Sequence, residues 1–343
     1  MFDTVVDMIV KAVQSTIWPS LYGFMIALPT FAVLAVLWQY LFKMEKGQRS
    51  IRGAVRQALP LGAYRSMTFK SDFFAWWIGQ LISPFLIHYF AHLITLVITS
   101  TIVYYFIVEY FGRPVAYFSD RSAIIAIQFV MLIISNEFGG YVSHYVFHRV
   151  PWLWSLHRTH HSAERLTVFT AQRAHPVELV IKNFIRTPIS AMMLGITLYF
   201  TAEKIDPYVF TILAATSIGA VHNLINHSEV KISFGKLNYI FYGPVLHQIH
   251  HSAELRHRDK NFGEGYLAIF DWIFGTLYVP EKRETWRFGL NEEELGKNNP
   301  HIRIRDFYFE PFAHAWAIIR RHHQKAGSSK NEFKHSLPVN ERE

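Results

Sequence analysis

Histidine is the residue type whose spacing points to chemistry in this chain. Eleven of the 19 histidines fall in two blocks, residues 144–175 and 222–251. On an α-helix, residues at positions i, i+3 and i+4 lie on one face. His157, His160 and His161 have this spacing, so their imidazole rings are expected to project together. The candidate metal ligands are His144, His148, His157, His160, His161, His175, His222, His227, His247, His250 and His251.

Clustered imidazoles indicate a transition-metal site. Neutral imidazole binds iron, zinc and copper well, whereas magnesium and calcium prefer oxygen ligands. Ten of the eleven candidates, all except His175, are closely spaced. Ten rings exceed the roughly four ligands of a structural zinc site, which favours two metals. Any single pair of histidines at this spacing could arise by chance. Four histidine clusters on the same face of a membrane, the arrangement that the topology described below predicts, could not. The chain has no cysteine, which excludes a Cys-containing zinc ribbon and a thiolate nucleophile.

The remaining histidines have no such companions. Two of them fall within or near an apolar segment, and the others fall in basic segments where we expect them to be solvated. They are His88, His92, His257, His301, His314, His322, His323 and His335.

The composition indicates a membrane protein. Of the 343 residues, 51% are hydrophobic, and several apolar runs reach membrane-spanning length. The net charge of +8 comes from basic residues that flank these runs. Anionic lipid headgroups or an acidic redox partner therefore fit this charge better than nucleic acid does. The acidic N-terminus lacks the basic start of a signal peptide, so we expect it to be retained.

The apolar runs predict five spans, preceded by a segment at the membrane surface over residues 3–18. We expect residues 73–85 to lie in the interface or to re-enter the membrane at Pro84. Because basic residues crowd the stretch 43–70, the positive-inside rule places that stretch in the cytoplasm. The expected spans are residues 20–42, 86–111, 122 to about 148, 179–200 and 208–227. This topology brings both histidine blocks to the cytoplasmic side.

The predicted fold is all-α: a polytopic membrane helix bundle with a cytoplasmic helical cap that carries the histidine-rich metal site. We expect three regions. They are an N-terminal membrane region (1–120), a histidine-rich catalytic domain (121–285) and a basic cytoplasmic extension (286–343). The polar end of the extension is predicted to be disordered from about Ala326.

The histidine motifs resemble those of the fatty acid hydroxylase / sterol desaturase superfamily of integral-membrane, non-haem diiron enzymes. The resemblance covers about residues 136–280. It rests on Tyr145-Val-Phe-His148-Arg149, Trp154-Ser-Leu-His157-Arg-Thr-His160-His161-Ser162, Arg173-Ala-His175-Pro176-Val-Glu178, His222-Asn-Leu-Ile-Asn226-His227, Leu246-His247-Gln-Ile-His250-His251, Asp259-Lys-Asn261-Phe-Gly263 and Asp271-Trp272-Ile-Phe-Gly275-Thr276. It implies two irons held by histidine at the cytoplasmic helix ends, with a lipid that enters from the bilayer. His175 matches a His-Pro position, which implies a place beside the ligands or an occasional ligand.

Three further residues are candidates for auxiliary roles. Glu137 shares a helix face with the first histidines, with Tyr141 between them, so it could orient a ligand or pass a proton. A buried structural glutamate is an equal alternative. His222 and His227 are five residues apart and would point about 140° away from each other on an ideal helix. Either the helix loosens there or they serve different metals, with Asn226 as a hydrogen-bonding neighbour.

The resemblance implies an oxidoreductase that uses O2 and two electrons from a separate donor protein or small reductant. It favours hydroxylation of a C–H bond in a membrane lipid, with desaturation at the same site as the alternative. A membrane metal-binding or transport protein is the alternative from another class. Transport is disfavoured because it requires polar groups near the bilayer midplane, and these histidines cluster at helix ends. The expected location is the bacterial inner membrane or the endoplasmic reticulum membrane.

Overall fold

The computed structural model describes residues 25–45, 47, 49–82, 88–113, 120–201, 222–295, 299 and 301–336. These residues are mostly helical and contain no named strand, although two isolated antiparallel bridges join Phe241 to Leu267 and Ser252 to Phe288. The all-α prediction is therefore confirmed for this part of the chain. The surface segment expected at 3–18 and most of the span expected at 208–227 lie outside the described residues.

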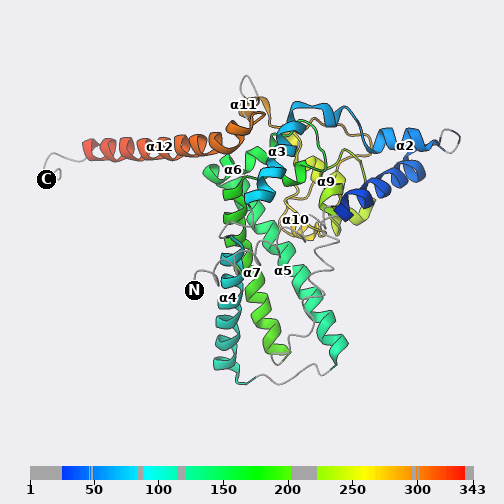
Figure 1. The fold of residues 1–343 in the computed structure, drawn as a ribbon. Helices are drawn as coiled ribbons and strands as arrows, with labels where there is room; N and C mark the ends of the chain where they lie inside the picture. Colours follow the sequence, from blue (N-terminus) through cyan, green and yellow to red (C-terminus); the bar gives the residue numbers. More distant parts are fainter. Residues whose placement is uncertain are drawn as a thin grey trace, which may run out of the picture.

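Three long helices run side by side and form the stem of the molecule (Figure 1). They are α4 (His88–Phe111), α5 (Arg121–Arg149) and α7 (Pro176–Phe200). A Cβ atom added at Gly195 of α7 would lie 2.6 Å from the carbonyl oxygen of Ser100 in α4. Only glycine permits this close approach of the two helices.

The stem helices have the length and composition of membrane spans. Segments Ser122–Arg149 and Pro176–Phe200 are long and apolar enough to cross a membrane, and Ile98–Phe111 of α4 is a shorter apolar stretch. Together with the match of α4 to the span expected at 86–111, they support a membrane protein.

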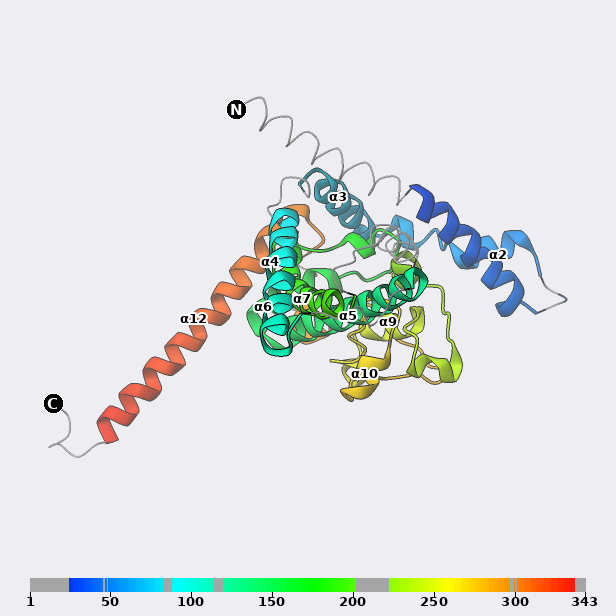
Figure 2. The ribbon, with the colours of Figure 1, turned by 90° about the horizontal axis from the view of Figure 1, so that it is seen from below.

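The apolar helix Met25–Lys43 is also long enough to span, but it lies across the direction of the stem helices (Figures 1 and 2). Its last turn, η1 (Gln39–Lys43), is a π-helix. Ala27, Phe31 and Ala35 on one face pack in a core cluster with Val168 and Val230, close to the histidine blocks. Thus one face of this helix is used to pack against the histidine-bearing region rather than against the stem.

The segment between Met25–Lys43 and the stem contains α2 (Ile51–Ala58), η3 (Ala63–Arg65) and α3 (Met67–Ile82). Ser50 caps α2, because its side chain accepts a hydrogen bond from the backbone N–H of Gly53. α3 carries Asp72, which is fully buried and pairs with Arg173. This pair connects the N-terminal part of the chain to the loop before His175, within the first histidine block.

Short helices and irregular segments gather at one end of the stem and carry most of the histidines (Figure 1). They are α6 (Pro151–His161), η5 (Thr170–Gln172), η6 (Gly235–Tyr239), α9 (Pro244–His250), η7 (Leu255–His257), α10 (Ile269–Ile273) and α11 (Glu292–Leu295). Both α6 and α9 begin with proline at a first-turn position, where no intrahelical N–H is required.

The chain continues as α12 (Ile304–Ser336), which projects away from the rest of the molecule (Figures 1 and 2). This helix passes through Ala326, where the sequence predicted the start of a disordered tail. The helix assignment extends to Ser336, the disordered tail stays a prediction, and residues 337–343 lie outside the described part.

Candidate metal centre

Nine histidines form two adjacent groups at the end of the stem. The first group has five members and the second has four, and within each group one ring nitrogen per residue lies within 4.8 Å of the others. The first group consists of His144, His148, His157, His161 and His250. The second group consists of His160, His227, His247 and His251.

Helices α6 and α9 divide their histidines between the groups in a reciprocal way. In α6, the i,i+4 pair His157 and His161 belongs to the first group, while His160 reaches the second. In α9, His247 belongs to the second group together with His251, the residue that caps the helix, while His250 reaches the first. The two groups are consequently in contact: the rings of His161 and His251 are 4.6 Å apart.

Hydrogen bonds on the outer side of the groups fix the tautomers of several rings. Nδ1 of His144 donates to the carbonyl oxygen of Phe262, and Nδ1 of His250 donates to that of Lys260, both at 2.9 Å. In the second group, Nδ1 of His160 and of His227 likewise face backbone carbonyl oxygens. A carbonyl oxygen can only accept, so each Nδ1 carries the proton and each Nε2 of the neutral ring presents a lone pair inward.

The inward nitrogens crowd one another in a way that a cation would relieve. Nε2 of His144 lies 2.9 Å from Nε2 of His157, and Nε2 of His247 lies 2.8 Å from Nε2 of His227. When both atoms carry lone pairs, such a contact is repulsive. Nε2 of His148 and of His250 are buried and have no hydrogen-bond partner. The donor set thus fits a transition metal in each group.

Burial keeps these rings in the neutral form that binds metal. For the six histidines of α6 and α9 named above, including His251, desolvation lowers the pKa well below the usual value, and neighbouring ionisable groups lower it further. Metal binding at neutral pH therefore does not require these rings to lose protons.

A buried network of charges supports the first group from α7. Nδ1 of His157 donates to Oε1 of Glu178 at 2.6 Å, and both side chains are 1% exposed. Lys182 lies 3.3 Å from the same carboxylate oxygen and 2.6 Å from Oε1 of Glu264. Sequence reasoning did not assign Glu178 a role, although it follows the His-Pro motif by two residues in the first turn of α7. A carboxylate bonded to a ligand imidazole fixes the ring and increases its basicity.

The loop of residues 259–263 holds histidines of both groups. Besides the two carbonyl contacts, Asp259 lies 3.7 Å from Nδ1 of His148. The hydroxyl of Tyr242 donates to the carbonyl oxygen of Asn261 and lies 3.3 Å from Nδ1 of His247. Asn261 adopts a φ of 57°, in the left-handed region that asparagine tolerates better than most residues.

Asp271 secures this loop. Its carboxylate accepts hydrogen bonds from the backbone N–H groups of Phe262 and Gly263 and from the hydroxyl of Thr276. Burial raises its pKa to about 6. The Asp271-to-Thr276 segment therefore positions the loop whose carbonyl groups bind His144 and His250.

Two predicted ligands lie outside both groups. Nδ1 of His175 accepts from the backbone N–H of Val177 as the cap of α7, and its Nε2 donates to the carbonyl oxygen of Tyr308. Nε2 of His222 donates to the carbonyl oxygen of Tyr242, and Nδ1 faces the amide of Asn226 at 3.4 Å. Since both nitrogens of each ring have partners, the structure does not support these two residues as ligands.

The three auxiliary candidates, Glu137, Tyr141 and Asn226, also lie outside both histidine groups. Glu137 accepts hydrogen bonds from the backbone N–H groups of Tyr266 and Leu267, which corresponds to the structural alternative. Tyr141 lies 3.2 Å from the hydroxyl of Thr276 and packs against Phe262, one aromatic layer from His144. Asn226 contacts His222 rather than a member of either group.

The expectation of solvated histidines in the basic segments is wrong for two of them. His257 is buried between Ser252 and Glu284, and His301 is buried beside Arg158 and Glu310. Each lies close to a carboxylate that is distant in sequence or brought in by another helix, a relationship that the local sequence does not show.

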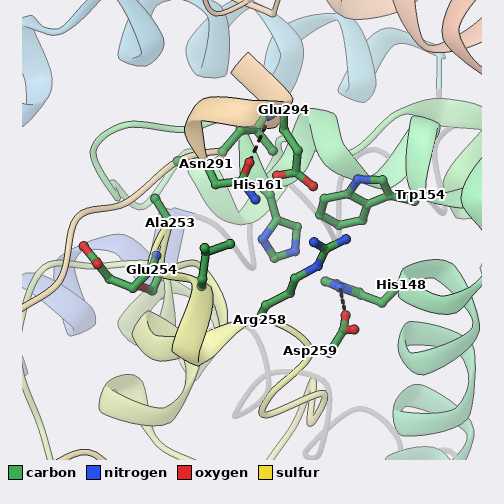
Figure 3. A pocket seen from close by; sticks show the side chains of 13 residues that line it. His148, Trp154, His161, Ala253, Glu254, Arg258, Asp259, Asn291 and Glu294 are labelled. Atoms are coloured by element: carbon green, nitrogen blue, oxygen red, sulfur yellow. Dashed lines mark hydrogen bonds and ion pairs between the residues drawn. The ribbon is translucent and has the colours of Figure 1, made fainter. Parts of the chain in front are cut away.

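A polar cleft of about 60 Å³ leads to the first group (Figure 3). His148, Trp154 and His161 line the cleft together with Arg258 and Asp259, and Asp259 lies beside His148. The ring of Trp154 lies 4.8 Å from that of His148. In contrast, all four histidines of the second group are buried. Small polar molecules can therefore approach the first group from the side away from the stem.

Comparison with known proteins finds one matching family model and several related enzymes. Residues 129–276 match the family model described as fatty acid hydroxylase. The chain is 31% identical over 166 residues to an ornithine lipid hydroxylase of Rhizobium tropici, covering 48% of this chain and 46% of that protein. It is 32% identical over 161 residues to the alkylglycerol monooxygenase of Xenopus tropicalis, covering 45% of this chain and 31% of that protein.

A very-long-chain aldehyde decarbonylase of Oryza sativa is 29% identical over 158 residues, covering 45% of this chain and 24% of that protein. No solved structure matches the chain. The matches thus span less than half the length of these relatives. The family match, residues 129–276, includes all nine grouped histidines. Together with the histidine motifs, they show that the histidine-bearing segment of the chain is similar to the fatty acid hydroxylase family.

Proposed function

We propose that this protein is a membrane-bound, non-haem diiron oxygenase that hydroxylates a C–H bond of a membrane lipid. The observation that carries the proposal is the pair of buried imidazole groups, five and four histidines, within the segment that matches the fatty acid hydroxylase family. Two irons held there would supply activation of O2 for attack on an unactivated C–H bond, with electrons from an external donor.

The protein residues hold the ligands in place and limit the access of water. The loop of residues 259–263 and Glu178 fix the orientation of imidazole rings in the first group. Burial of the second group keeps bulk water away from it. The C–H step requires no acid–base side chain. The metal would supply the reactivity, and the protein would supply orientation and enclosure.

Regarding substrate, we propose a lipid with a polar headgroup. The named relatives include a hydroxylase of ornithine lipid and a monooxygenase of alkylglycerol. His144 and His148 lie in the last turns of α5, where an apolar span ends. A lipid that slides in laterally would therefore present a carbon close to its headgroup or upper chain.

We further propose that α4, α5 and α7 cross the membrane and that the metal site faces the cytoplasm. Exposed basic residues such as Arg52, Arg56 and Arg149 lie on the part of the chain that carries the histidines. At the opposite end of the stem, the described residues include Arg113 as an exposed basic side chain. This asymmetry follows the positive-inside rule. Reporter fusions after Arg113 and after Ser336 should report opposite sides of the membrane.

Labelled dioxygen provides the decisive test of the reaction. Lipids from cells with and without the protein, grown under ¹⁸O2, should differ by a species that carries one labelled oxygen atom. A new alkene without label would replace the hydroxylase proposal with the desaturase alternative at the same site. Bound metal without any oxidised lipid or oxygen consumption would favour a metal-binding or transport protein.

A further inference from the structure

The first half of α12 carries a row of exposed apolar side chains. Phe309, Phe312, Trp316 and Ile319, here called the α12 stripe, are 68%, 46%, 67% and 36% exposed, respectively. Their spacings of three, four and three residues place them on one face of the helix. Contiguous exposed aromatic residues on a helix indicate an interaction with another protein or with a membrane.

The opposite face of α12 is already occupied. Nδ1 of His314 lies 2.8 Å from the hydroxyl of Ser155 in α6, and Glu310 forms an ion pair with Arg158 at 3.1 Å. Phe307 is fully buried. Contacts with α6 therefore fix the rotation of α12 about its axis, and the stripe is left without a described covering element.

The position of α12 relative to the stem identifies what lies next to the stripe. The carbonyl oxygen of Tyr308 accepts a hydrogen bond from His175, the residue that caps α7. The ring of Phe312 packs 5.0 Å from the ring of the same histidine. The apolar span begins at Pro176, so the stripe starts at the boundary where α7 enters the membrane.

The direction of α12 agrees with this position. The helix runs across the stem helices, and a view along the stem shows it extending outward from the side of the bundle (Figures 1 and 2). A membrane that contains the stem would have its surface parallel to α12. A helix in that plane can insert one face along its length into the interface.

The charges on α12 favour binding to an anionic membrane surface. Arg303, Arg305, Arg320 and Arg321 are exposed. Of the acidic residues beside them, Asp306 offsets only Arg305, and Glu310 is paired with Arg158 and His301. Arginine can extend from the edge of an apolar stripe to lipid phosphates, and tryptophan is favoured at the membrane interface. An antiparallel second copy of α12 would bring Arg305 of one chain close to Arg320 of the other, which is unfavourable.

We propose that α12 is an interfacial anchor whose stripe inserts into the membrane surface next to α7 and whose arginines bind anionic lipid headgroups. The anchor would hold α6, and with it His157, His160 and His161, at a fixed height above the bilayer. This inference depends on the stem being embedded in a membrane and does not depend on the identity of the metal or the reaction.

Spin labels on the full chain test the proposal directly. The protein has no cysteine, so each variant with a single cysteine at positions 315 to 321 carries one label. In nanodiscs of phosphatidylcholine with phosphatidylglycerol, we expect access to oxygen to be highest at positions 316 and 319. Access to a water-soluble nickel chelate should be highest at position 321, an exposed site away from the stripe. Equal nickel access at positions 316, 319 and 321 would overturn insertion, and spin–spin broadening at 316 would indicate a second copy instead.

Varying the lipid composition of the discs distinguishes recognition of anionic headgroups from insertion of the stripe alone. The label at position 316 should lie deeper in discs that contain phosphatidylglycerol than in discs of phosphatidylcholine only. Combining Arg305→Gln with Arg320→Gln should remove this difference, whereas Arg283→Gln, a control at an exposed arginine outside α12, should preserve it. The same depth in both kinds of disc for the parent chain would refute recognition of anionic lipid.

Discussion

Nδ1 of His157 and Oε1 of Glu178 are 2.6 Å apart and almost completely buried, although they belong to different helices, α6 and α7. α7 is one of the apolar stem helices, and α6 carries three of the nine grouped histidines. The contact therefore connects a candidate membrane span to the proposed metal site. It also means that the orientation of His157 depends on the position of the first turn of α7.

The first prediction concerns this contact. Glu178→Ala should lower metal affinity by roughly 10- to 100-fold, because loss of a partner to a ligand imidazole typically has an effect of this size. Glu178→Gln retains an acceptor for Nδ1 and should have a smaller effect. Metal content after competition with a chelator measures both. Glu281→Gln, at an exposed carboxylate that does not line the cleft, is the control. Unchanged affinity in Glu178→Ala would show that the carboxylate serves only to balance Lys182.

The second prediction separates the grouped histidines from a predicted ligand that lies outside the groups. His250→Ala should reduce the metal bound per chain and abolish lipid oxidation, because its inward Nε2 belongs to the first group. His222→Ala should retain the metal, because both ring nitrogens are engaged by Tyr242 and Asn226. Elemental analysis of the purified variants provides the measurement. Equal metal loss in the two variants would restore His222 as a ligand.

The helical spacing of histidines identifies eight of the nine residues that the structure brings together, because i,i+3 and i,i+4 positions share a face whatever the tertiary fold. The ninth, His227, has no such companion and was identified from its motif. The same rule could not decide His222, since a spacing of five leaves both alternatives open. Only the tertiary structure shows that its ring turns toward Tyr242 and Tyr266.

The supporting partners could not be read from local spacing. His144 bonds to Phe262, which is 118 residues away, and the acceptor is a backbone carbonyl that every residue type possesses. Similarly, basic surroundings suggested that His301 is solvated, yet Glu310 and Arg158 come together around it only through the packing of α12 on α6. Apolar length identified Met25–Lys43 but did not determine its direction relative to the stem.

The third prediction concerns the ion pair of Arg173 and Asp72, both completely buried. Arg173→Met would leave the Asp72 carboxylate without its cation and should destabilise the protein by about 3–5 kcal/mol. Adding Asp72→Asn should recover part of this loss, because it removes the uncompensated charge. Thermal unfolding of the two variants and the double variant measures the coupling. Additive effects would show that the ion pair itself contributes no coupling energy.

The fourth prediction concerns acid stability. Nε2 of His301 accepts a hydrogen bond from Arg158 at 3.2 Å, which requires an unprotonated nitrogen. Burial, followed by the charges of Arg158 and Arg173, lowers its pKa to about 2. The unfolded chain binds this proton below about pH 6.5 and the folded chain does not, so stability should fall as the pH decreases from about 6.5 toward 2. The contribution of this one group is at most about 1.4 kcal/mol per pH unit.

A variant without the titrating ring isolates that contribution. His301→Gln keeps an acceptor for Arg158 but cannot gain a proton in this range, so its stability should decrease less steeply between about pH 6 and pH 4 than that of the parent chain. Arg303→Gln, an exposed site two residues away, should retain the parent slope. Denaturant unfolding at several pH values measures the slopes. Identical slopes for the parent chain and His301→Gln would show that His301 is already protonated in the folded protein, with Glu310, 3.5 Å away, as its counter-ion.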